Sequence, residues 1–336
     1  MTQPAIARES VVNRVIVVGT SAGGLHALGA LLGYLPADLP AAILLVMHIG
    51  SRFSVLPEVL QRHSALPVAF AQDRQELVAG TVVVAPPDRH LLVMREGAAL
   101  RAVLSCAAKE NHTRPAIDPL FRTVAEAADG RAVGVILSGY LDDGVAGLQA
   151  IKACGGVAVA QDPAEAAAPD MPRNAVSNVA LDLCAPLQEI AAALTRYART
   201  PPPAAGAHEI PSWLRTENRI VADGGDLKAL QQIASPSNYA CPACGGVLFE
   251  MTQRRPTRYR CHTGHAFSAL SLLLEQQTVI EESLRSAVRA LHEKESLAEQ
   301  LAAESTLHGR APEADYAGIA RRCREEAAQL LALLAG

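Results

Sequence analysis

Uninterrupted runs of hydrophobic residues alternate, in the first part of the chain, with stretches in which leucines recur every three or four positions. A continuous apolar run predicts a strand buried on both faces, and the longer spacing predicts a helix. The first such pair is a strand at residues 15–18 and a helix that ends before Pro36. Ser21 lies in the turn between them, at the edge where open α/β sheets bind ligands, so it is a candidate nucleophile. The alternative is that Thr20 or Ser21 only caps the helix.

The same alternation continues to about residue 198. Further strands are predicted at residues 41–47, 68–71, 81–84, 132–137 and 157–160, and a hairpin at 91–95 and 99–104. Helices are predicted at residues 55–60, 118–128, 145–151 and 187–197, the second with Asp118 as its N-cap and Pro119 at its first position. The pattern predicts an α/β fold, with a doubly wound, mostly parallel sheet and an antiparallel hairpin.

Two titratable side chains follow buried strands of this predicted sheet. His48 directly follows the strand at residues 41–47, and Asp143 lies in the turn after residues 132–137. If the strands are neighbours, Ser21, His48 and Asp143 supply a nucleophile, a general base and an orienting carboxylate. Simpler alternatives are a helix cap for Asp142 or Asp143 and a backbone-bonded His48.

Glycines and further histidines surround these positions. Gly23 and Gly24 are expected to let a substrate approach the backbone beside Ser21, and Gly144 to open the turn after Asp143. Weaker candidates for the base lie in predicted loops, namely His63, His90 and His112.

The composition narrows the function classes. The 336 residues carry a net charge of −4, which gives no case for general affinity for nucleic acid or a membrane surface. No apolar run approaches the ~20 residues of a membrane helix, and residues 1–10 lack the apolar stretch of a signal peptide. Three of the seven cysteines cluster with a histidine, which favours a reducing cytoplasm and a metal site over disulfides.

That cluster has the spacing of a zinc site. Cys241 and Cys244 form a C-x2-C pair, Cys261 follows after 16 residues, and His265 after three more. Four protein ligands close a tetrahedron, so we predict a structural zinc ion in a small zinc-ribbon-like module. The alternatives are a redox-active C-x-x-C pair and His262 as the fourth ligand.

These features divide the chain into four parts. Residues 1–198 form the predicted α/β domain, and 199–236 a linker with a short helix around Trp213. Residues 237–269 form the zinc-ribbon-like module, and 270–336 two helices separated by Gly309 and Pro312. Apolar residues spaced by three, four or seven predict that these helices form a hairpin or a coiled coil that links copies of the chain.

Six motifs in order carry a resemblance to a known family. They are GTSAGG at 19–24, VMHIG at 46–50, VAPPDRHL at 84–91, RPAIDPLF at 114–121, GVILSGYLDDGVAGL at 134–148 and MPRNAV at 171–176. From residue 13 to about 195 the chain resembles the catalytic domain of CheB-type protein-glutamate methylesterases. The resemblance implies hydrolysis of γ-glutamyl methyl esters on chemoreceptor helices, with release of methanol, and in many members deamidation of glutamines.

The resemblance also implies roles for individual residues. Ser21 corresponds to the nucleophile, His48 to the base and Asp143 to the carboxylate, preferred to Asp142 because the family's aspartate directly precedes the glycine. The family's oxyanion donors are amides near His48 and in the Ser-Gly-Tyr turn, here involving Tyr140. The cysteine-rich segment resembles the zinc-ribbon tail of stand-alone CheB-like proteins. Two arginines are candidates for contacting the acidic receptor surface or are ordinary surface residues, namely Arg114 and Arg173.

The sequence also departs from the family pattern. About a dozen residues precede the first strand, so no phosphorylatable receiver domain is expected, and Tyr140 replaces a common methionine. We therefore weigh an esterase against a non-enzymatic CheB-like scaffold that binds a signalling partner through its zinc ribbon and C-terminal helices. A Rossmann-type nucleotide enzyme is disfavoured, because Ser21 occupies the middle glycine position of G-x-G-x-x-G. The expected partners are methylated receptor helices and a second copy of the chain, without nucleic acid, membrane insertion or a catalytic cofactor.

Overall fold

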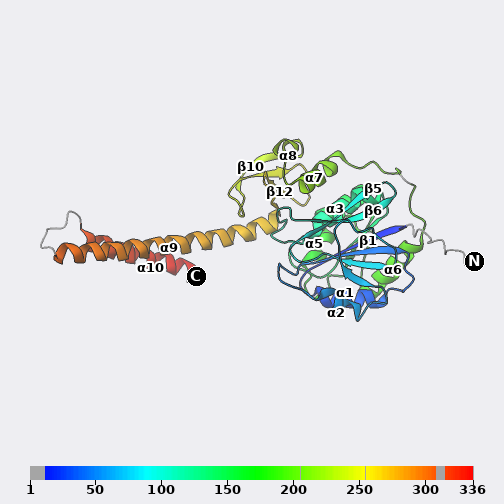
Figure 1. Cartoon of the computed structure of the whole chain (residues 1–336), viewed down its shortest axis with the longest axis horizontal. Coiled ribbons are helices and arrows are strands. Elements are labelled where there is room, and N and C mark those ends of the chain that lie inside the picture. The colour runs from blue at the N-terminus through cyan, green and yellow to red at the C-terminus, as the bar shows by residue number, and fades with distance from the viewer. Residues whose placement is uncertain (1–11, 205, 254, 308–314, 336) are drawn as a thin grey trace, which may run out of the picture. The chain divides into compact units, whose positions relative to one another are not determined.

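A seven-stranded parallel sheet forms the centre of the first unit of the protein (Figure 1). The computed structural model describes residues 12–204, 206–253, 255–307 and 315–335. The strand order is β3-β4-β2-β1-β7-β8-β9. This arrangement confirms the predicted α/β fold with a mostly parallel sheet. The strands are β1 (Arg14–Thr20), β2 (Ala41–Met47), β3 (Val68–Phe70), β4 (Thr81–Val84), β7 (Ala132–Ile136), β8 (Val157–Gln161) and β9 (Leu183–Ala185).

Helices cover both faces of this sheet (Figure 1). One face carries α1 (Gly24–Tyr34), α2 (Leu56–Gln61) and α6 (Leu187–Arg199), and the other carries α3 (Ile117–Ala128), α4 (Val145–Ala153) and α5 (Asp170–Asn178). Along β1, Ile16 and Val18 lie in the core formed with α1, α2 and α6, whereas Val15 and Val17 lie in the core formed with α3, α4 and α5. Both faces are therefore dry, which explains the uninterrupted apolar runs.

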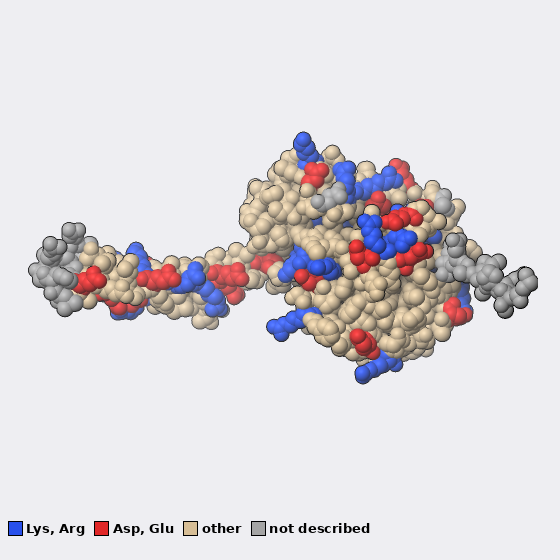
Figure 2. All heavy atoms as spheres, in the orientation of Figure 1, with Lys and Arg blue, Asp and Glu red and all other residues tan. Residues whose placement is uncertain are grey.

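The predicted hairpin is present as a separate two-stranded sheet. Strands β5 (His90–Glu96) and β6 (Ala99–Ser105) pair antiparallel, and their inward residues join the core around α3. Figure 2 shows acidic and basic side chains interspersed over this part of the surface. Arg74 and Arg101 both pair with Glu96, at 3.0 and 2.9 Å. Such exposed ion pairs contribute little to stability.

The helices beside the strand ends begin differently from the prediction. Gly23, with a left-handed φ of 74°, is the N-cap of α1, and the Thr20 hydroxyl instead donates to the carbonyl of Ser138 at 2.7 Å. Gly144, with φ of 92°, is the N-cap of α4, and no side chain caps that helix. The cap interpretations of Thr20, Ser21, Asp142 and Asp143 are therefore wrong.

Helix α3 also begins two residues earlier than the predicted Asp118 cap implies. Its N-cap is Ala116, so Asp118 is the second helical residue and not the cap. The Asp118 carboxylate instead accepts a hydrogen bond from the backbone N–H of Gly147, at 2.7 Å, and thereby joins α3 to α4.

The region from residue 212 to 272, here called the Cys/His module, has its own small core. It contains α7 (Ser212–Asp223), α8 (Leu227–Ile233) and an antiparallel sheet of β10 (Ala234–Ala240), β11 (Val247–Met251), β12 (Arg258–Cys261) and β13 (Ala266–Ser268). Trp213 packs against this core and also against the core around α3. The stretch that the sequence indicated as a linker thus contains two helices and part of a strand. The described residues between 12 and 272 form one compact unit.

A buried network of charges joins the module to the sheet domain. Arg260 donates to Glu110 at 2.8 Å and to Glu217 at 3.1 Å, Arg122 also donates to Glu110, and Arg258 donates to Glu217. Burial alone would raise the pKa of Glu110, but Arg122 and Arg260 outweigh burial and lower it. Removing one partner of such a buried pair typically costs about 3–5 kcal/mol. The network therefore holds the module in a fixed place on the sheet domain.

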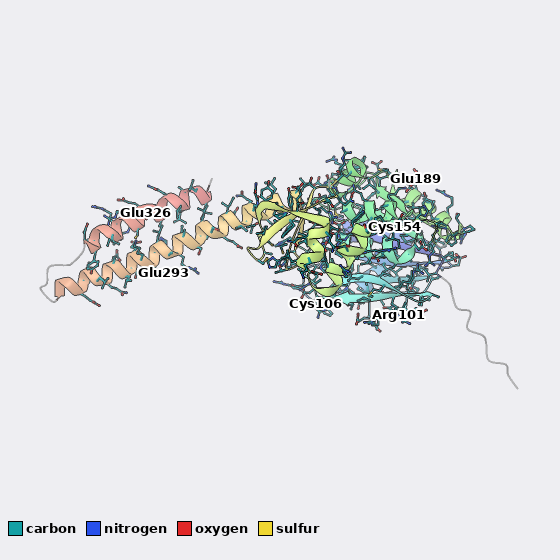
Figure 3. All side chains as sticks on the ribbon, turned by 90° about the horizontal axis from the view of Figure 1, so that it is seen from above. Arg101, Cys106, Cys154, Glu189, Glu293 and Glu326 are labelled. Carbon is teal, nitrogen blue, oxygen red and sulfur yellow. The ribbon has the colours of Figure 1, made fainter. Side chains whose placement is uncertain are left out.

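The described residues from 273 onwards form a second unit, which is helical. Helix α9 (Ala269–Leu307) lies alongside α10 (Tyr316–Ala335), as Figure 1 and Figure 3 both show. Arg324 of α10 donates to Glu295 and Glu299 of α9, each at 2.7 Å. The two helices form the predicted hairpin, and the coiled-coil alternative stays a prediction. Gly309 and Pro312, the expected break, lie outside the described residues, as do residues 1–10.

Across the described residues, no helix combines the length and the hydrophobicity that crossing a membrane requires.

Candidate active site

Three neighbouring strands bring the predicted triad residues to one edge of the sheet. Strand β1 lies between β2 and β7, with Thr20 beside Met47 and Gly19 beside Ile136. Ser21 follows β1, His48 follows β2, and Asp143 lies in the turn after β7. The chain passes from β1 to α1 on one face of the sheet and from β7 to α4 on the other face, so the boundary between β1 and β7 is a topological switch point, where α/β sheets bind ligands.

Their side chains form a hydrogen-bonded series. His48 Nδ1 lies 3.2 Å from Ser21 Oγ, and His48 Nε2 lies 2.8 Å from Asp143 Oδ2. In chymotrypsin-like proteases Nε2 faces the serine and Nδ1 faces the aspartate, whereas here the two nitrogens have exchanged these partners. In either arrangement one nitrogen can accept the serine proton while the other donates to the carboxylate. If Nε2 carries the proton held by Asp143, Nδ1 is free to accept the hydroxyl proton. The alternative in which His48 binds a backbone carbonyl is wrong.

The Asp143 carboxylate is held by donors from α3 and its preceding loop. The backbone N–H groups of Ile117 and Asp118 donate to it at 2.7 and 3.2 Å, and Asn111 Nδ2 donates at 2.9 Å. Burial alone would raise the pKa of Asp143, but the hydrogen bond and charge of His48, with the bonds from Ile117 and Asn111, lower it. The start of α3 thus stabilises the ionised carboxylate. Asn111 was missed by the sequence analysis, because no local pattern links this loop to Asp143.

Two further carboxylates lie close to Asp143 in different surroundings. Asp118 is buried, and its burial and the charge of Asp143 raise its pKa to about 7. Asp142 accepts a hydrogen bond from Ser268 Oγ at 2.5 Å, and burial raises its pKa to about 6. Of the two adjacent aspartates, Asp143 and not Asp142 contacts His48.

We expect these buried carboxylates to make the protein less stable as the pH rises. The pKa of Asp118 is higher in the folded than in the unfolded chain, so the folded state binds more protons between about pH 4 and pH 7. The free energy of unfolding should therefore fall between about pH 4 and pH 7, by on the order of 3 kcal/mol from Asp118 alone. Urea unfolding at several pH values measures this slope.

The matched variants are Asp118→Asn and, at an exposed position, Asp38→Asn. The first should flatten most of the slope, because an amide still accepts from Gly147 but carries no charge. The second should leave the slope as it is. An unchanged slope in Asp118→Asn would contradict the assignment of the raised pKa.

The turn after β7 packs directly on the candidate nucleophile. A Cβ atom at Gly139 would lie 3.0 Å from Ser21 Cβ and 2.1 Å from Met171 Sδ, so only glycine fits. Leu141 in the same turn has a left-handed φ of 62°, and its carbonyl accepts a hydrogen bond from Asn174 at 2.7 Å. Tyr140 between them is 63% exposed. Within the described residues its backbone N–H has no protein acceptor.

The glycines beside Ser21 have packing roles. A Cβ at Gly23 would lie 2.7 Å from Ala167 Cβ, and one at Gly24 would lie 2.5 Å from Thr20 Oγ1. Gly144 takes a left-handed φ, as the predicted turn after Asp143 requires.

The weaker sequence candidates lie in other environments. His90 is buried, where Nε2 lies 3.1 Å from the carbonyl of Ala108 and Nδ1 accepts from Ala116 N–H. Arg114 donates to Asp88 at 2.7 Å and to two loop carbonyls, so it is a structural residue of this loop. Arg173 is exposed on α5, and His63 on the segment after α2. His112 follows Asn111 in the loop before α3.

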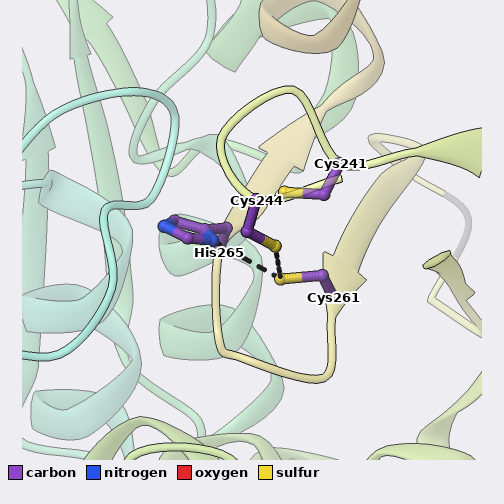
Figure 4. Close-up of side chains that lie close together, drawn as sticks. All are labelled: Cys241, Cys244, Cys261 and His265. Carbon is purple, nitrogen blue, oxygen red and sulfur yellow. Dashed lines mark hydrogen bonds between the residues drawn. The ribbon is translucent and has the colours of Figure 1, made fainter. Parts of the chain in front are cut away.

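The four predicted metal ligands form a compact cluster in the module (Figure 4). The ligand atoms of Cys241, Cys244, Cys261 and His265 all lie within 4.8 Å of one another. Sγ of Cys244 lies 3.8 Å from Sγ of Cys261, which matches the ~3.8 Å edge of a tetrahedron with Zn–S bonds of about 2.3 Å. This donor set therefore fits a tetrahedral metal ion, and His262 is not part of it.

Comparison with known proteins identifies the family of the sheet domain. The model of the CheB methylesterase family matches residues 16–194, more than half of the chain. The chain belongs to the CheB methylesterase family. The matched segment contains Ser21, His48 and Asp143 but not the Cys/His cluster.

Individual relatives agree with this assignment. A Leptospira interrogans protein, provisionally named a protein-glutamate methylesterase/protein-glutamine glutaminase, is 37% identical over 177 residues, which are 52% of this chain and 90% of that protein. Protein-glutamate methylesterase/protein-glutamine glutaminase 4 of Anaeromyxobacter dehalogenans is 37% identical over 198 residues, 59% of this chain and 55% of that protein. The crystal structure of the Thermotoga maritima CheB methylesterase catalytic domain superposes with a TM-score of 0.54 and 30% identity, covering 55% of this chain and 99% of that domain.

Proposed function

We propose that this member of the CheB family is a serine hydrolase that removes methyl esters from glutamyl side chains of chemoreceptor-like proteins. The observation that carries the proposal is the series of hydrogen bonds from Ser21 through His48 to Asp143 at the switch point of the sheet. The names of the relatives from Anaeromyxobacter and Leptospira support this reaction and add glutamine deamidation as a second activity.

In the proposed mechanism, His48 acts as the general base. Its Nδ1 takes the proton of Ser21 as the hydroxyl oxygen attacks the ester carbonyl, while Asp143 stabilises the imidazolium through Nε2. The proton then passes from His48 to the departing methoxide, so methanol leaves and a glutamyl-serine ester forms. Water, deprotonated by His48, hydrolyses that ester and restores Ser21. An amide substrate would follow the same steps with ammonia as the leaving group.

The tetrahedral intermediate carries an oxyanion that needs hydrogen-bond donors. We propose the backbone N–H of Tyr140 as one donor and an amide next to His48 as the other. The support for Tyr140 is the tight packing of its turn on Ser21, together with the absence of a protein acceptor for this N–H in the described residues.

The experiment that tests hydrolysis through Ser21 is the capture of the acyl-enzyme. p-Nitrophenyl acetate should give a burst of p-nitrophenol, and peptide mapping after acid quench should place the acetyl group on Ser21. An acetyl group on another residue, or none at all, would favour the alternative of a non-enzymatic scaffold that binds a signalling partner.

We further propose that Cys241, Cys244, Cys261 and His265 hold a structural zinc ion. The tetrahedral fit of the sulfur atoms supports this, and four protein ligands leave no open position for catalysis.

A site of thiolate ligands needs reducing surroundings, so we propose a cytoplasmic location. As part of this proposal, the division by role is a catalytic domain (1–198), a segment whose two helices pack on the metal module (199–236), a zinc-ribbon-like module (237–269) and a helical tail (270–336). The tail offers a surface for a second copy or a receptor helix.

A further inference from the structure

The last strand of the Cys/His module reaches the residues behind the catalytic aspartate. Ser268 N–H donates to Asn111 Oδ1 at 2.9 Å, and Ser271 Oγ donates to the same oxygen at 3.0 Å. Asn111 N–H in turn donates to the carbonyl of Ala266 at 2.8 Å. The module therefore holds both the backbone and the side chain of Asn111.

The amide nitrogen of the Asn111 side chain faces two carboxylates. Its Nδ2 donates to Asp143 Oδ1 at 2.9 Å and to Asp118 Oδ2 at 3.3 Å. A flipped amide would turn its oxygen towards two carboxylates and its NH2 group towards two donors. The serine contacts therefore fix the orientation in which Asn111 donates to Asp143.

The module also holds the residue that precedes Asp143. Ser268 Oγ donates to Asp142 Oδ1 at 2.5 Å, and Ser268 and Asp142 are both buried. Asp142 directly precedes Asp143 in the chain, Asn111 donates to the Asp143 carboxylate, and Ser268 contacts both Asp142 and Asn111. Without this serine, Asp142 would remain buried without its hydroxyl donor, which favours a rearranged turn.

The strand that carries Ser268 is held in place by neighbouring elements of the module and of the sheet domain. Residues 266–268 form β13, which pairs with β12, and Arg260 of β12 is fixed by Glu110 and Glu217. Glu110 is the neighbour of Asn111 in the chain, so the buried ion network and the serine contacts act on the same loop.

We infer that Asn111 is a positioning residue for Asp143 and that Ser268 and Ser271 of the Cys/His module complete the support of the active site. This inference rests on the proposed function, because it assigns Asp143 to the triad. Ser268 and Ser271 would then act through Asn111 and Asp142 and not on the substrate. Small displacements of a catalytic group can cost about 10²-fold in rate. We therefore expect Asn111→Ala and the double variant Ser268→Ala/Ser271→Ala to lower kcat by about 10- to 100-fold, with little change in KM.

The kinetic test compares these variants with Ser237→Ala in hydrolysis of p-nitrophenyl acetate. Ser237 is a matched control, because its hydroxyl donates within the module, to the carbonyl of Leu248 at 2.7 Å, and contacts no residue of the triad. Ser237→Ala should retain the wild-type kcat. Wild-type kcat in both Asn111→Ala and the double serine variant would overturn the inference while leaving the proposed function intact. Thermal unfolding of each variant identifies any that fail to fold.

A second measurement does not depend on hydrolysis. The proton between His48 Nε2 and Asp143 gives a downfield resonance in the NMR spectrum when the bond is ordered. It should shift or broaden in Asn111→Ala and in the double serine variant, and stay unchanged in Ser237→Ala. If the wild type hydrolyses no ester, the proposed function fails, and this resonance still decides whether the module orders the His48–Asp143 pair. An unchanged resonance in the folded variants would overturn the inference.

Discussion

Ser21→Ala is expected to lower ester hydrolysis by about 10⁵- to 10⁶-fold, the largest effect of any single change in this protein. The variant removes the only oxygen that His48 Nδ1 contacts among the described side chains, so no acyl-enzyme can form. The residual rate would come from binding and from the oxyanion donors alone. Initial rates with p-nitrophenyl acetate measure the loss, and thermal unfolding should show a fold as stable as that of the wild type.

Asp143→Asn is expected to lower the rate less than Ser21→Ala does. It should reduce kcat by about 10⁴-fold, because an amide does not hold His48 in the required tautomer. It should also destabilise the fold, since every contact of the carboxylate comes from a donor and an amide NH2 group would face at least one of them. A Ser21→Ala variant that keeps more than about 1% of the wild-type rate would contradict the assignment of the nucleophile.

Loss of the metal is expected to have the second largest effect. The four proposed ligands come from the turn after β10, from the end of β12 and from the β12–β13 connection, so a bound metal ion would tie together the strands of a small sheet. Structural zinc sites contribute about 10–16 kcal/mol of apparent binding free energy in small modules. A strong chelator, or Cys261→Ser, should therefore abolish protection from hydrogen exchange in β10–β13. Metal analysis of the purified protein should give one zinc ion per chain.

The expected consequence extends to the active site. Because β13 carries Ser268 beside Asn111 and Asp142, chelation should lower hydrolysis although none of the four proposed ligands belongs to the triad. Cys106→Ser is a suitable control, since this exposed cysteine is not part of the cluster. Protein that binds no metal, or whose β10–β13 strands keep their protection in chelator, would contradict the zinc proposal.

The sheet domain could be predicted because its strands are buried on both faces. Continuous apolar runs identified β1, β2, β7 and β8, and the polar residues that follow three of these strands proved to be neighbours. Strand β9 and helix α5 escaped notice. Strand β9 is a three-residue edge strand, and α5 buries few apolar residues, so neither leaves a clear period in the sequence.

The contacts between distant segments could not be predicted. Asn111, Asp118 and Ser268 are polar residues with no local signature, and their partners lie up to 160 residues away. The predicted first residues of the helices were wrong for a related reason. Gly23 and Gly144 begin α1 and α4 with left-handed backbones, which frees the neighbouring polar side chains for tertiary contacts such as those of Thr20 and Asp143.

The most direct test of the central claim is methanol release from a methylated chemoreceptor. The wild-type protein should release methanol, the receptor should lose its methyl esters in mass spectra, and Ser21→Ala should release none above background. Methanol release at the same rate by wild type and Ser21→Ala would contradict the role of Ser21. No release by either protein, while p-nitrophenyl acetate is still hydrolysed, would contradict the proposed substrate class.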